Sequence, residues 1–266
     1  MNISEWNVTC ENVKKHMVEY VKYFITPIFK VLKDNSTQEE YGEHFASGSF
    51  IQINHTKHLI TNEHVTREIQ HNSLAHQFLN SDCVLRIVNH FYAKEYPLDI
   101  AITKIDEIVW NQCQHNSIPI PLTEFLPQHN PVDGELLFII GYSGERSKFL
   151  FNNLFSAGTP YVTQEKSVQN KTKNDIYHFA IHYEPEKAIN FENNSKGLPN
   201  PSGFSGSLVW NTRFVEQTKL GNEWKSSDAK VTGLIFSWDP DNTCLWATKV
   251  EHFELKEYIK QLESNT

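Results

Sequence analysis

Short apolar runs separated by turn-forming residues follow one another from residue 28 onward, and this pattern restricts the fold more than any other feature. The segments between the runs lack the helical patterns of about 10–15 residues that the crossovers of a parallel sheet require. Many short strands without intervening helices predict an all-β sandwich or barrel. The runs lie at 28–32, 48–53, 59–61, 84–89, 100–105, 136–140, 149–155, 177–181, 207–210, 231–237 and 245–250.

A helical pattern precedes the first of these runs, and a second one closes the chain. In the first pattern, Val13 and Met17 lie at helical spacing after Thr9, which suits an N-cap. Pro27 would end this helix, because proline removes a backbone donor. Apolar residues between 253 and 262 recur at mixed helical spacing. We expect the first helix to pack on the outside of the domain rather than to enter a membrane or bind a partner.

Two segments of the chain have the composition of loops. The segment 118–131 contains four prolines, which suits a linker between two lobes. The segment 184–202 is polar and rich in Asn, Pro and Gly. Long loops in a compact domain often carry function, and this one directly precedes the most informative motif of the sequence.

Charge and composition exclude several classes of function. The net charge of −8 and the pI of about 5.9 provide no basic footprint, so nucleic acid is not an expected partner. No stretch reaches the roughly 18 apolar residues that span a bilayer, so we expect no membrane partner. The first residues also lack the basic start and apolar core of a signal peptide.

The four cysteines are far apart in the sequence: Cys10, Cys83, Cys113 and Cys244. None has a Cys-x-x-Cys neighbour, so we expect neither a zinc site nor another metal or cofactor. A secreted domain held by disulfides would usually carry more cysteines at closer spacing. We therefore expect free thiols in a reducing compartment and a cytoplasmic protein.

The most informative string is Pro-Ser-Gly-Phe-Ser-Gly-Ser at 201–207. Ser205 lies between glycines, which allow the backbone to turn sharply and leave room for a substrate. They also allow the N–H groups of Gly203 and Ser205 to point at one oxygen as an oxyanion hole. Ser205 is therefore a candidate nucleophile, although the same string also suits an ordinary turn.

Two further strings place a histidine and a carboxylate at strand ends. His64 follows the apolar run at 59–61, so a strand aims it at a fixed point. Asp99 directly precedes the run at 100–105. A buried aspartate is costly without a hydrogen-bond partner. Asp99 therefore either has such a partner or makes a local turn bond at the start of its strand.

The three strings occur in the order His, Asp, Ser, and their order and context resemble the chymotrypsin/trypsin-like serine peptidases. Thr-Asn-Glu-His at 61–64 stands where that family has Thr-Ala-Ala-His, and Asp-Ile-Ala-Ile at 99–102 where it has Asp-Ile-Ala-Leu. Gly-Phe-Ser-Gly-Ser at 203–207 stands in place of Gly-Asp-Ser-Gly-Gly. The strings at 233–238 and 245–250 resemble the strand beside the substrate and the strand that leads into the terminal helix.

The resemblance implies an all-β fold of two antiparallel six-stranded barrels, with an added helix at each end of the chain. A helical extension at 1–25 would precede a first barrel at 26–125, which would carry the histidine and the aspartate. The second barrel and the C-terminal helix would occupy 126–266 and carry the serine. The active site would lie between the two barrels.

The resemblance also implies a serine endopeptidase that cleaves protein or peptide substrates through an acyl-enzyme intermediate, without a cofactor. Ser205 would attack the peptide carbonyl, His64 would move its proton, and Asp99 would hold His64. The N–H groups of Gly203 and Ser205 would form the oxyanion hole. The residues beside the substrate would be Ser237, Trp238 and Asp239.

Two departures from the family pattern concern activation and location. Phe204 replaces the acidic residue that pairs with a new N-terminus in trypsin-like zymogens, so activation by cleavage is not expected. The loop 184–202 would instead set the oxyanion hole, and a regulatory protein partner could act on it. Val65 follows His64 where extracellular members have cysteine, which indicates an intracellular protein of a bacterial-type branch.

The specificity pocket has a weaker signature. The family's specificity position, six residues before the nucleophile, falls on Pro199, and we expect Leu245 to make the pocket shallow. Both features favour a small or apolar P1 residue. Asp239 lies at the expected pocket mouth, so a basic P1 residue is the alternative.

Two other functions agree with parts of the sequence. An α/β-hydrolase esterase would use Ser205, Asp239 and His252, but it needs Gly-x-Ser-x-Gly on a strand–helix elbow. Residue 207 is serine, and a strand-like run follows it. A catalytically inert barrel pair that binds a peptide or protein partner is the second alternative. The unusual oxyanion segment favours it, and the retained triad disfavours it.

Overall fold

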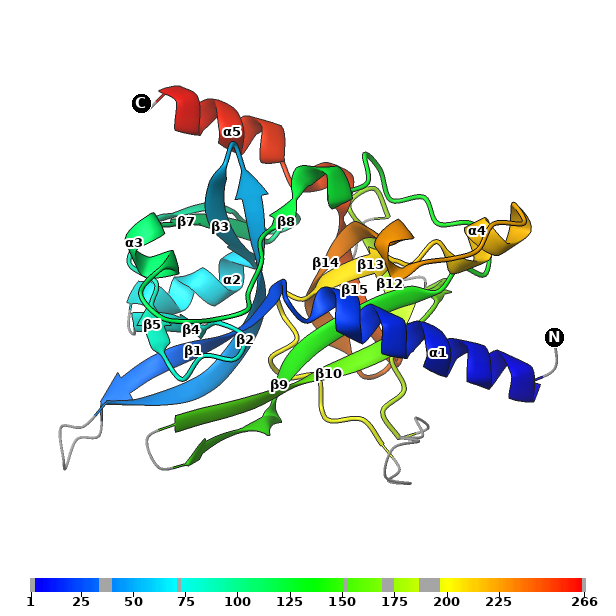
Figure 1. Cartoon of the computed structure of the whole chain (residues 1–266), viewed down its shortest axis with the longest axis horizontal. Helices are drawn as coiled ribbons and strands as arrows, with labels where there is room; N and C mark the ends of the chain where they lie inside the picture. The colour runs from blue at the N-terminus through cyan, green and yellow to red at the C-terminus, as the bar shows by residue number, and fades with distance from the viewer. Residues whose placement is uncertain are drawn as a thin grey trace.

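The computed structural model describes residues 3–33, 40–70, 73–150, 153–168, 175–186 and 197–264. This part of the chain forms two β-sheets, with one helix before the first sheet and another after the last strand (Figure 1). The first sheet consists of β1 (Ile25–Lys33), β2 (Glu40–Ile53), β3 (Thr56–Thr61), β4 (Ser73–Gln77), β5 (Val84–Arg86), β6 (Phe91–Lys94), β7 (Ile100–Ile105) and β8 (Ile120–Pro121). Its strand order is β5-β4-β1-β2-β3-β7-β6, and β8 pairs with β2 in parallel.

The second sheet follows the first along the chain. It consists of β9 (Leu137–Leu150), β10 (Asn153–Thr163), β11 (Glu165–Lys166), β12 (His178–His182), β13 (Leu208–Asn211), β14 (Lys230–Asp239) and β15 (Cys244–Lys249). Its strands pair antiparallel in the order β10-β9-β13-β14-β15-β12-β11. The two sheets confirm the predicted all-β class. Across the described residues they hold eight and seven strands, against six expected for each barrel, partly because two-residue strands such as β8 and β11 join them.

The helix that precedes the first sheet is α1 (Ile3–Val21), and it starts and ends earlier than the sequence predicts. Thr9 is not its N-cap but lies inside the helix, where its hydroxyl donates to the Glu5 carbonyl at 2.9 Å. Pro27 lies within β1 and not at the helix end. As predicted, α1 packs on the outside of the sheets, where it contacts β9 and β10. Its buried face consists of Val13, Met17 and Val21.

The remaining helices are short, apart from α5 (Leu255–Ser264) at the end of the chain. Tyr258 of α5 packs edge-on against the ring of His58 in β3, at a centroid distance of 5.4 Å. The other helical segments are α2 (Glu63–Thr66), η1 (Arg67–Gln70), α3 (Glu107–Trp110), η2 (Leu122–Glu124), α4 (Phe214–Lys219), η3 (Ser226–Asp228) and η4 (Val250–His252). No helix among the described residues has both the length and the apolar character needed to cross a bilayer.

One predicted strand differs from the structure. The apolar run at 149–155 is not one strand, because it holds the reversal between β9 and β10, where Leu150 pairs with Asn153. The predicted linker at 118–131 contains η2 and also β8, in which Ile120 pairs with Ile51 of β2.

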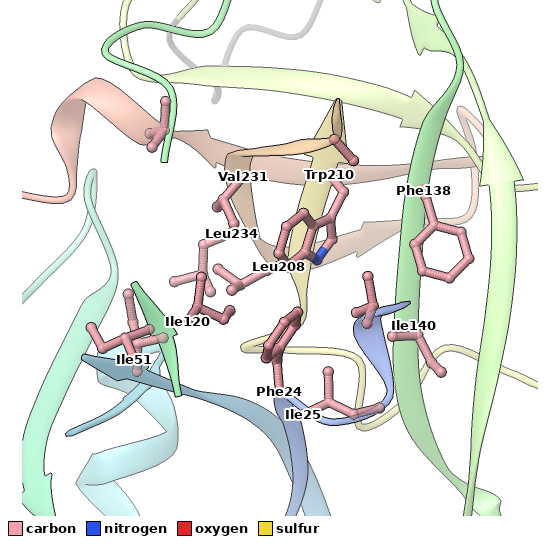
Figure 2. Close-up of a cluster of buried hydrophobic side chains, with 14 of the residues drawn as sticks. Phe24, Ile25, Ile51, Ile120, Phe138, Ile140, Leu208, Trp210, Val231 and Leu234 are labelled. Carbon is pink, nitrogen blue, oxygen red and sulfur yellow. The ribbon is translucent and has the colours of Figure 1, made fainter. Parts of the chain in front are cut away.

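The largest apolar cluster joins the two sheets (Figure 2). Ile51 and Ile120 of the first sheet lie beside Leu208 and Leu234 of the second, and Phe24 stacks on Trp210 at a centroid distance of 5.8 Å. A shared core of this kind holds one sheet against the other, so residues from the two sheets can form a site with a fixed geometry.

Candidate active site

His64 and Asp99 lie at neighbouring strand ends of the first sheet. β3 ends at Thr61 and α2 then carries His64, while Asp99 directly precedes β7. Because β3 and β7 are antiparallel neighbours with Thr61 opposite Ala101, the two ends come together. Nδ1 of His64 lies 2.7 Å from Oδ2 of Asp99, and the His64 backbone N–H donates to Oδ1 at 2.9 Å. Asp99 is only 6% exposed, so it has the partner that a buried carboxylate requires.

The backbone of Asp99 is held in an unusual conformation by a residue that sequence reasoning missed. Its φ of +49° lies in the left-handed region, which costs a residue other than glycine about 1–3 kcal/mol. Asn62, which is fully buried, donates from Nδ2 to the Asp99 carbonyl at 2.7 Å. The Asp99 N–H donates to the Glu95 carbonyl at 3.2 Å. The sequence contained one signal for this role, a polar asparagine directly after a strand-like run and two residues before His64.

Ser205 lies in the loop 201–207, which we call the nucleophile loop. Its carbonyl accepts a hydrogen bond from the N–H of Ser47 in β2 at 2.8 Å, and the next N–H, of Gly206, donates to Ile235 in β14 at 2.9 Å. A Cβ at Gly206, whose φ is +87°, would collide with the Ser47 carbonyl and with Thr61 Oγ1. Ser205 is therefore held where the two sheets meet, beside the strand end that precedes His64.

The structure does not join the serine to the histidine by a hydrogen bond. Within the described residues, neither Ser205 Oγ nor His64 Nε2 has a hydrogen-bond partner. The catalytic bond of a peptidase is often long or poorly aligned in the absence of substrate. The geometry therefore provides an oriented histidine–aspartate pair and a serine at the same junction of the sheets.

Phe204 anchors the nucleophile loop in the core of the second sheet. Its side chain is 1% exposed and packs edge-on against Tyr183, with the ring centroids 5.7 Å apart. A Cβ at Gly141 would lie only 2.8 Å from the Phe204 ring, so glycine at that position makes room for it. Burial raises the pKa of Tyr183, so its hydroxyl stays protonated. This hydroxyl donates a hydrogen bond to the Pro199 carbonyl at 2.7 Å.

Residues 187–196 of the predicted regulatory loop lie outside the described residues.

The two candidate oxyanion donors belong to peptide units whose carbonyls are already bonded. The Ser202 carbonyl accepts from Gly144 N–H at 3.3 Å, and the Phe204 carbonyl accepts from Ser207 N–H at 2.9 Å. In a trans peptide the N–H points opposite to the carbonyl of the same unit. The N–H groups of Gly203 and Ser205 therefore point away from these partners, and neither donates a hydrogen bond within the described residues.

His44 of β2 lies against Gly203, since a Cβ at Gly203 would collide with its ring. Burial lowers the pKa of His44 to about 4, although a bond to the Tyr142 carbonyl at 3.1 Å partly opposes the shift. The ring is consequently neutral at pH 7, and it adds no positive charge beside the nucleophile loop.

The predicted substrate-binding residues form the end of β14. β14 pairs with β15 as far as Asp239, which lies opposite Cys244, whereas its pairing with β13 stops at Leu234. Beyond the Ile235–Ser207 bond, Ser237 and Trp238 have no strand partner among the described residues on the edge of β14 that faces away from β15. An extended peptide can pair with such an edge. The third predicted substrate-binding residue, Asp239, is the last residue of β14.

Two observations bear on the predicted specificity pocket. Asp239 accepts hydrogen bonds from Asn242 N–H at 3.1 Å, from Asn242 Nδ2 at 2.9 Å and from Trp246 Nε1 at 3.3 Å. Its carboxylate therefore stabilises the turn between β14 and β15. Leu245 is buried in the same cluster as Phe204 and does not face an open pocket.

The residues of the esterase alternative are not assembled. His252 bonds the Ile176 carbonyl at 2.9 Å, and no hydrogen bond joins it to Asp239 in the described part of the chain. Ser205 is followed by a strand and not by the helix of a nucleophile elbow. Among the described residues no group of three or more His, Cys, Asp or Glu side chains could hold a metal ion.

No protein-family model and no curated protein sequence matches this chain. Among solved structures, the apo MamO protease domain from Magnetospirillum magneticum is similar, with 10% identity, a TM-score of 0.50 and coverage of 89% of this chain and 96% of that one. A protease from M. tuberculosis in its active form has 14% identity and a TM-score of 0.48, covering 91% of this chain and 82% of that one. The catalytically inactive tobacco etch virus protease, complexed with substrate, has 16% identity and a TM-score of 0.43, covering 89% and 83%.

The likeness to the MamO domain shows the fold: this chain has the two-barrel architecture of the chymotrypsin-like proteases, with a helix at each end. Low sequence identity with a shared architecture is common, because many side-chain combinations fill the same core. The chemistry of the site has to be argued from this chain's own residues.

Proposed function

We propose that the protein is a serine endopeptidase in which Ser205 is the nucleophile, His64 the general base and acid, and Asp99 the residue that orients His64. The observation that carries the proposal is the two-point contact of Asp99 with His64, at 2.7 Å to Nδ1 and 2.9 Å to the backbone N–H. Because the carboxylate accepts the Nδ1 proton, the neutral ring presents Nε2 as an acceptor. This tautomer can take a proton from a serine hydroxyl.

In the proposed reaction, Ser205 Oγ attacks the scissile carbonyl carbon while Nε2 of His64 takes the hydroxyl proton. The N–H groups of Gly203 and Ser205 stabilise the oxyanion, and loss of one such donor typically costs about 10²–10³-fold in turnover. His64 then gives the proton to the leaving amine as the carbon–nitrogen bond breaks. A water molecule, deprotonated by the same imidazole, hydrolyses the acyl-enzyme and restores Ser205.

The substrate in this proposal is an extended segment of a protein or peptide. It would pair with the open edge of β14 at Ser237 and Trp238. A small or apolar P1 residue is favoured, because the Asp239 carboxylate is engaged by Asn242 and Trp246. The four cysteines are free thiols, which supports the proposed location in the reducing cytoplasm.

A fluorophosphonate probe tests the proposal, because it reacts covalently with an activated serine. We expect the folded protein to be labelled at Ser205, as located by peptide mass spectrometry. Ser205→Ala and His64→Ala should abolish labelling, whereas Ser227→Ala, at an exposed serine within η3, should not change it. Folded protein that is never labelled, and that cleaves no peptide in a proteome-derived library, would contradict the proposal.

The second candidate function is an inert module that binds an extended peptide at β14. The unformed hydrogen bond between Ser205 and His64 is the observation that favours it. Capture of unmodified peptides without cleavage in the same library experiment would support this candidate over the peptidase.

A further inference from the structure

We propose that Ser47, in the first sheet, is a positioning residue that holds the nucleophile loop of the second sheet in the arrangement needed for catalysis. This inference rests on the proposed peptidase function. It concerns a residue that does not touch the reacting atoms and that acts through Gly203 and Ser205.

Ser47 lies in β2, is 2% exposed, and contacts the nucleophile loop through both its backbone and its side chain. Its N–H donates to the Ser205 carbonyl at 2.8 Å, and its hydroxyl donates to the Gly203 carbonyl, also at 2.8 Å. The same hydroxyl accepts a hydrogen bond from the N–H of Tyr142 in β9 at 2.9 Å. One side chain of the first sheet thus connects two elements of the second.

The hydroxyl of Ser47 restrains the backbone of Gly203 in the nucleophile loop. Gly203 has a φ of +101°, and glycine is the residue with the widest choice of backbone conformations. The peptide unit before it is held by the bond from Gly144 to the Ser202 carbonyl, and the unit after it by the bond from Ser47. With both units held, the direction of the Gly203 N–H is determined.

The two sides of the loop are held by different forces. The Phe204 side chain is buried in the apolar cluster of the second sheet, while the carbonyls on either side of it, of Gly203 and Ser205, are bonded to Ser47. Any residue other than proline at position 47 would supply the backbone N–H. A hydroxyl is needed to donate to Gly203 and accept from Tyr142 at once, and alanine can do neither.

Ser49 provides a matched control for this idea. It lies two residues further along β2, on the same face of the strand, and is fully buried. Its hydroxyl has no hydrogen-bond partner among the described residues. Ser49→Ala therefore removes the same atom from the same strand without removing a contact to the nucleophile loop.

The experiment compares Ser47→Ala with Ser49→Ala in the full chain by two readouts. The first is backbone amide hydrogen exchange at Phe204, Gly206 and Ser207, which requires no catalysis. We expect exchange at these amides to accelerate at least tenfold in Ser47→Ala and to stay within twofold of wild type in Ser49→Ala. The second is peptide hydrolysis, in which we expect kcat of Ser47→Ala to fall about 100-fold with KM nearly unchanged, because small misplacements at a catalytic centre have effects of this size.

Unchanged exchange in Ser47→Ala, or equal kcat losses in the two variants, would overturn the inference. If Ser47→Ala does not fold, hydrogen exchange of the Tyr142 amide in the wild-type protein tests the contact instead. This amide donates to the buried Ser47 hydroxyl, so it must be protected from exchange. An unprotected Tyr142 amide would overturn the inference. Wild-type protein that never reacts with the fluorophosphonate and cleaves no peptide of the library would refute the peptidase, whereas the exchange difference would still decide whether Ser47 holds the loop.

Discussion

Phe204 directly precedes the proposed nucleophile Ser205, and replacing Phe204 by alanine should separate the effect on loop position from the effect on stability. The side chain is 1% exposed and belongs to the cluster that includes Tyr183 and Leu245. Removing a buried phenylalanine side chain costs about 3–5 kcal/mol of unfolding free energy, through lost transfer energy and a residual cavity. The nucleophile loop would at the same time lose its apolar anchor.

We expect Phe204→Ala to lower kcat/KM about 100-fold, because Ser205 and the N–H of Gly203 are displaced when the anchor is lost. Phe78→Ala is the matched control. Phe78 is 2% exposed and packs in the core of the first sheet against Trp110 and His115, with no contact to the nucleophile loop in the described residues. It should lose a similar amount of stability and retain kcat/KM within about threefold of wild type.

Urea unfolding gives the free energies, and peptide hydrolysis well below each variant's unfolding temperature gives the rates. The reasoning fails if the two variants lose stability and kcat/KM in the same proportion, since activity would then follow stability alone. It also fails if Phe204→Ala keeps wild-type kcat/KM while losing the expected stability.

Three further predictions concern Asp99, the buried histidines and Asp239. Asn62→Ala removes the 2.7 Å hydrogen bond to the Asp99 carbonyl, so it should lower the unfolding free energy by about 1–3 kcal/mol and reduce kcat. Urea unfolding measures the first effect and peptide hydrolysis the second. An unchanged kcat would contradict the role given to Asn62. Burial lowers the folded-state pKa values of three histidines to about 4, 4 and 3, for His44, His58 and His76 respectively. The unfolded chain, with histidine pKa values near 6.5, then binds more protons below that pH, so stability should fall as pH drops from about 6.5 to 4, by up to about 1.4 kcal/mol per pH unit for each histidine. Urea unfolding at pH 7 and pH 5 measures this loss, and a His58→Gln variant that shows the wild-type slope would refute the contribution of His58. Asp239→Asn should leave the ratio of cleavage after alanine to cleavage after arginine unchanged in matched peptides, whereas a selective loss of cleavage after arginine would show that the carboxylate recognises basic side chains.

The strand pattern and the motif positions could be predicted from the sequence because they depend on local properties. Alternation of apolar and turn-forming residues sets where strands begin and end, so most predicted runs coincide with observed strands. The error at 149–155 arose because a hairpin reversal between two apolar strands has the same local composition as one strand. Thr9 was misassigned because a hydroxyl can bond a carbonyl one turn earlier inside a helix as well as cap its start.

By itself the sequence determined the all-β class and the placing of His64, Asp99 and Ser205 at strand ends and in a turn. Only the tertiary structure decided which side chains surround them. Ser47 and Gly203 are 156 residues apart in the chain, yet their hydrogen bond joins the two sheets at the nucleophile loop. The engagement of Asp239 by Trp246 and the burial of Phe204 beside Tyr183 likewise depend on how the strands pair and pack. Such contacts follow from the packing of the whole core, which no local pattern of residues specifies.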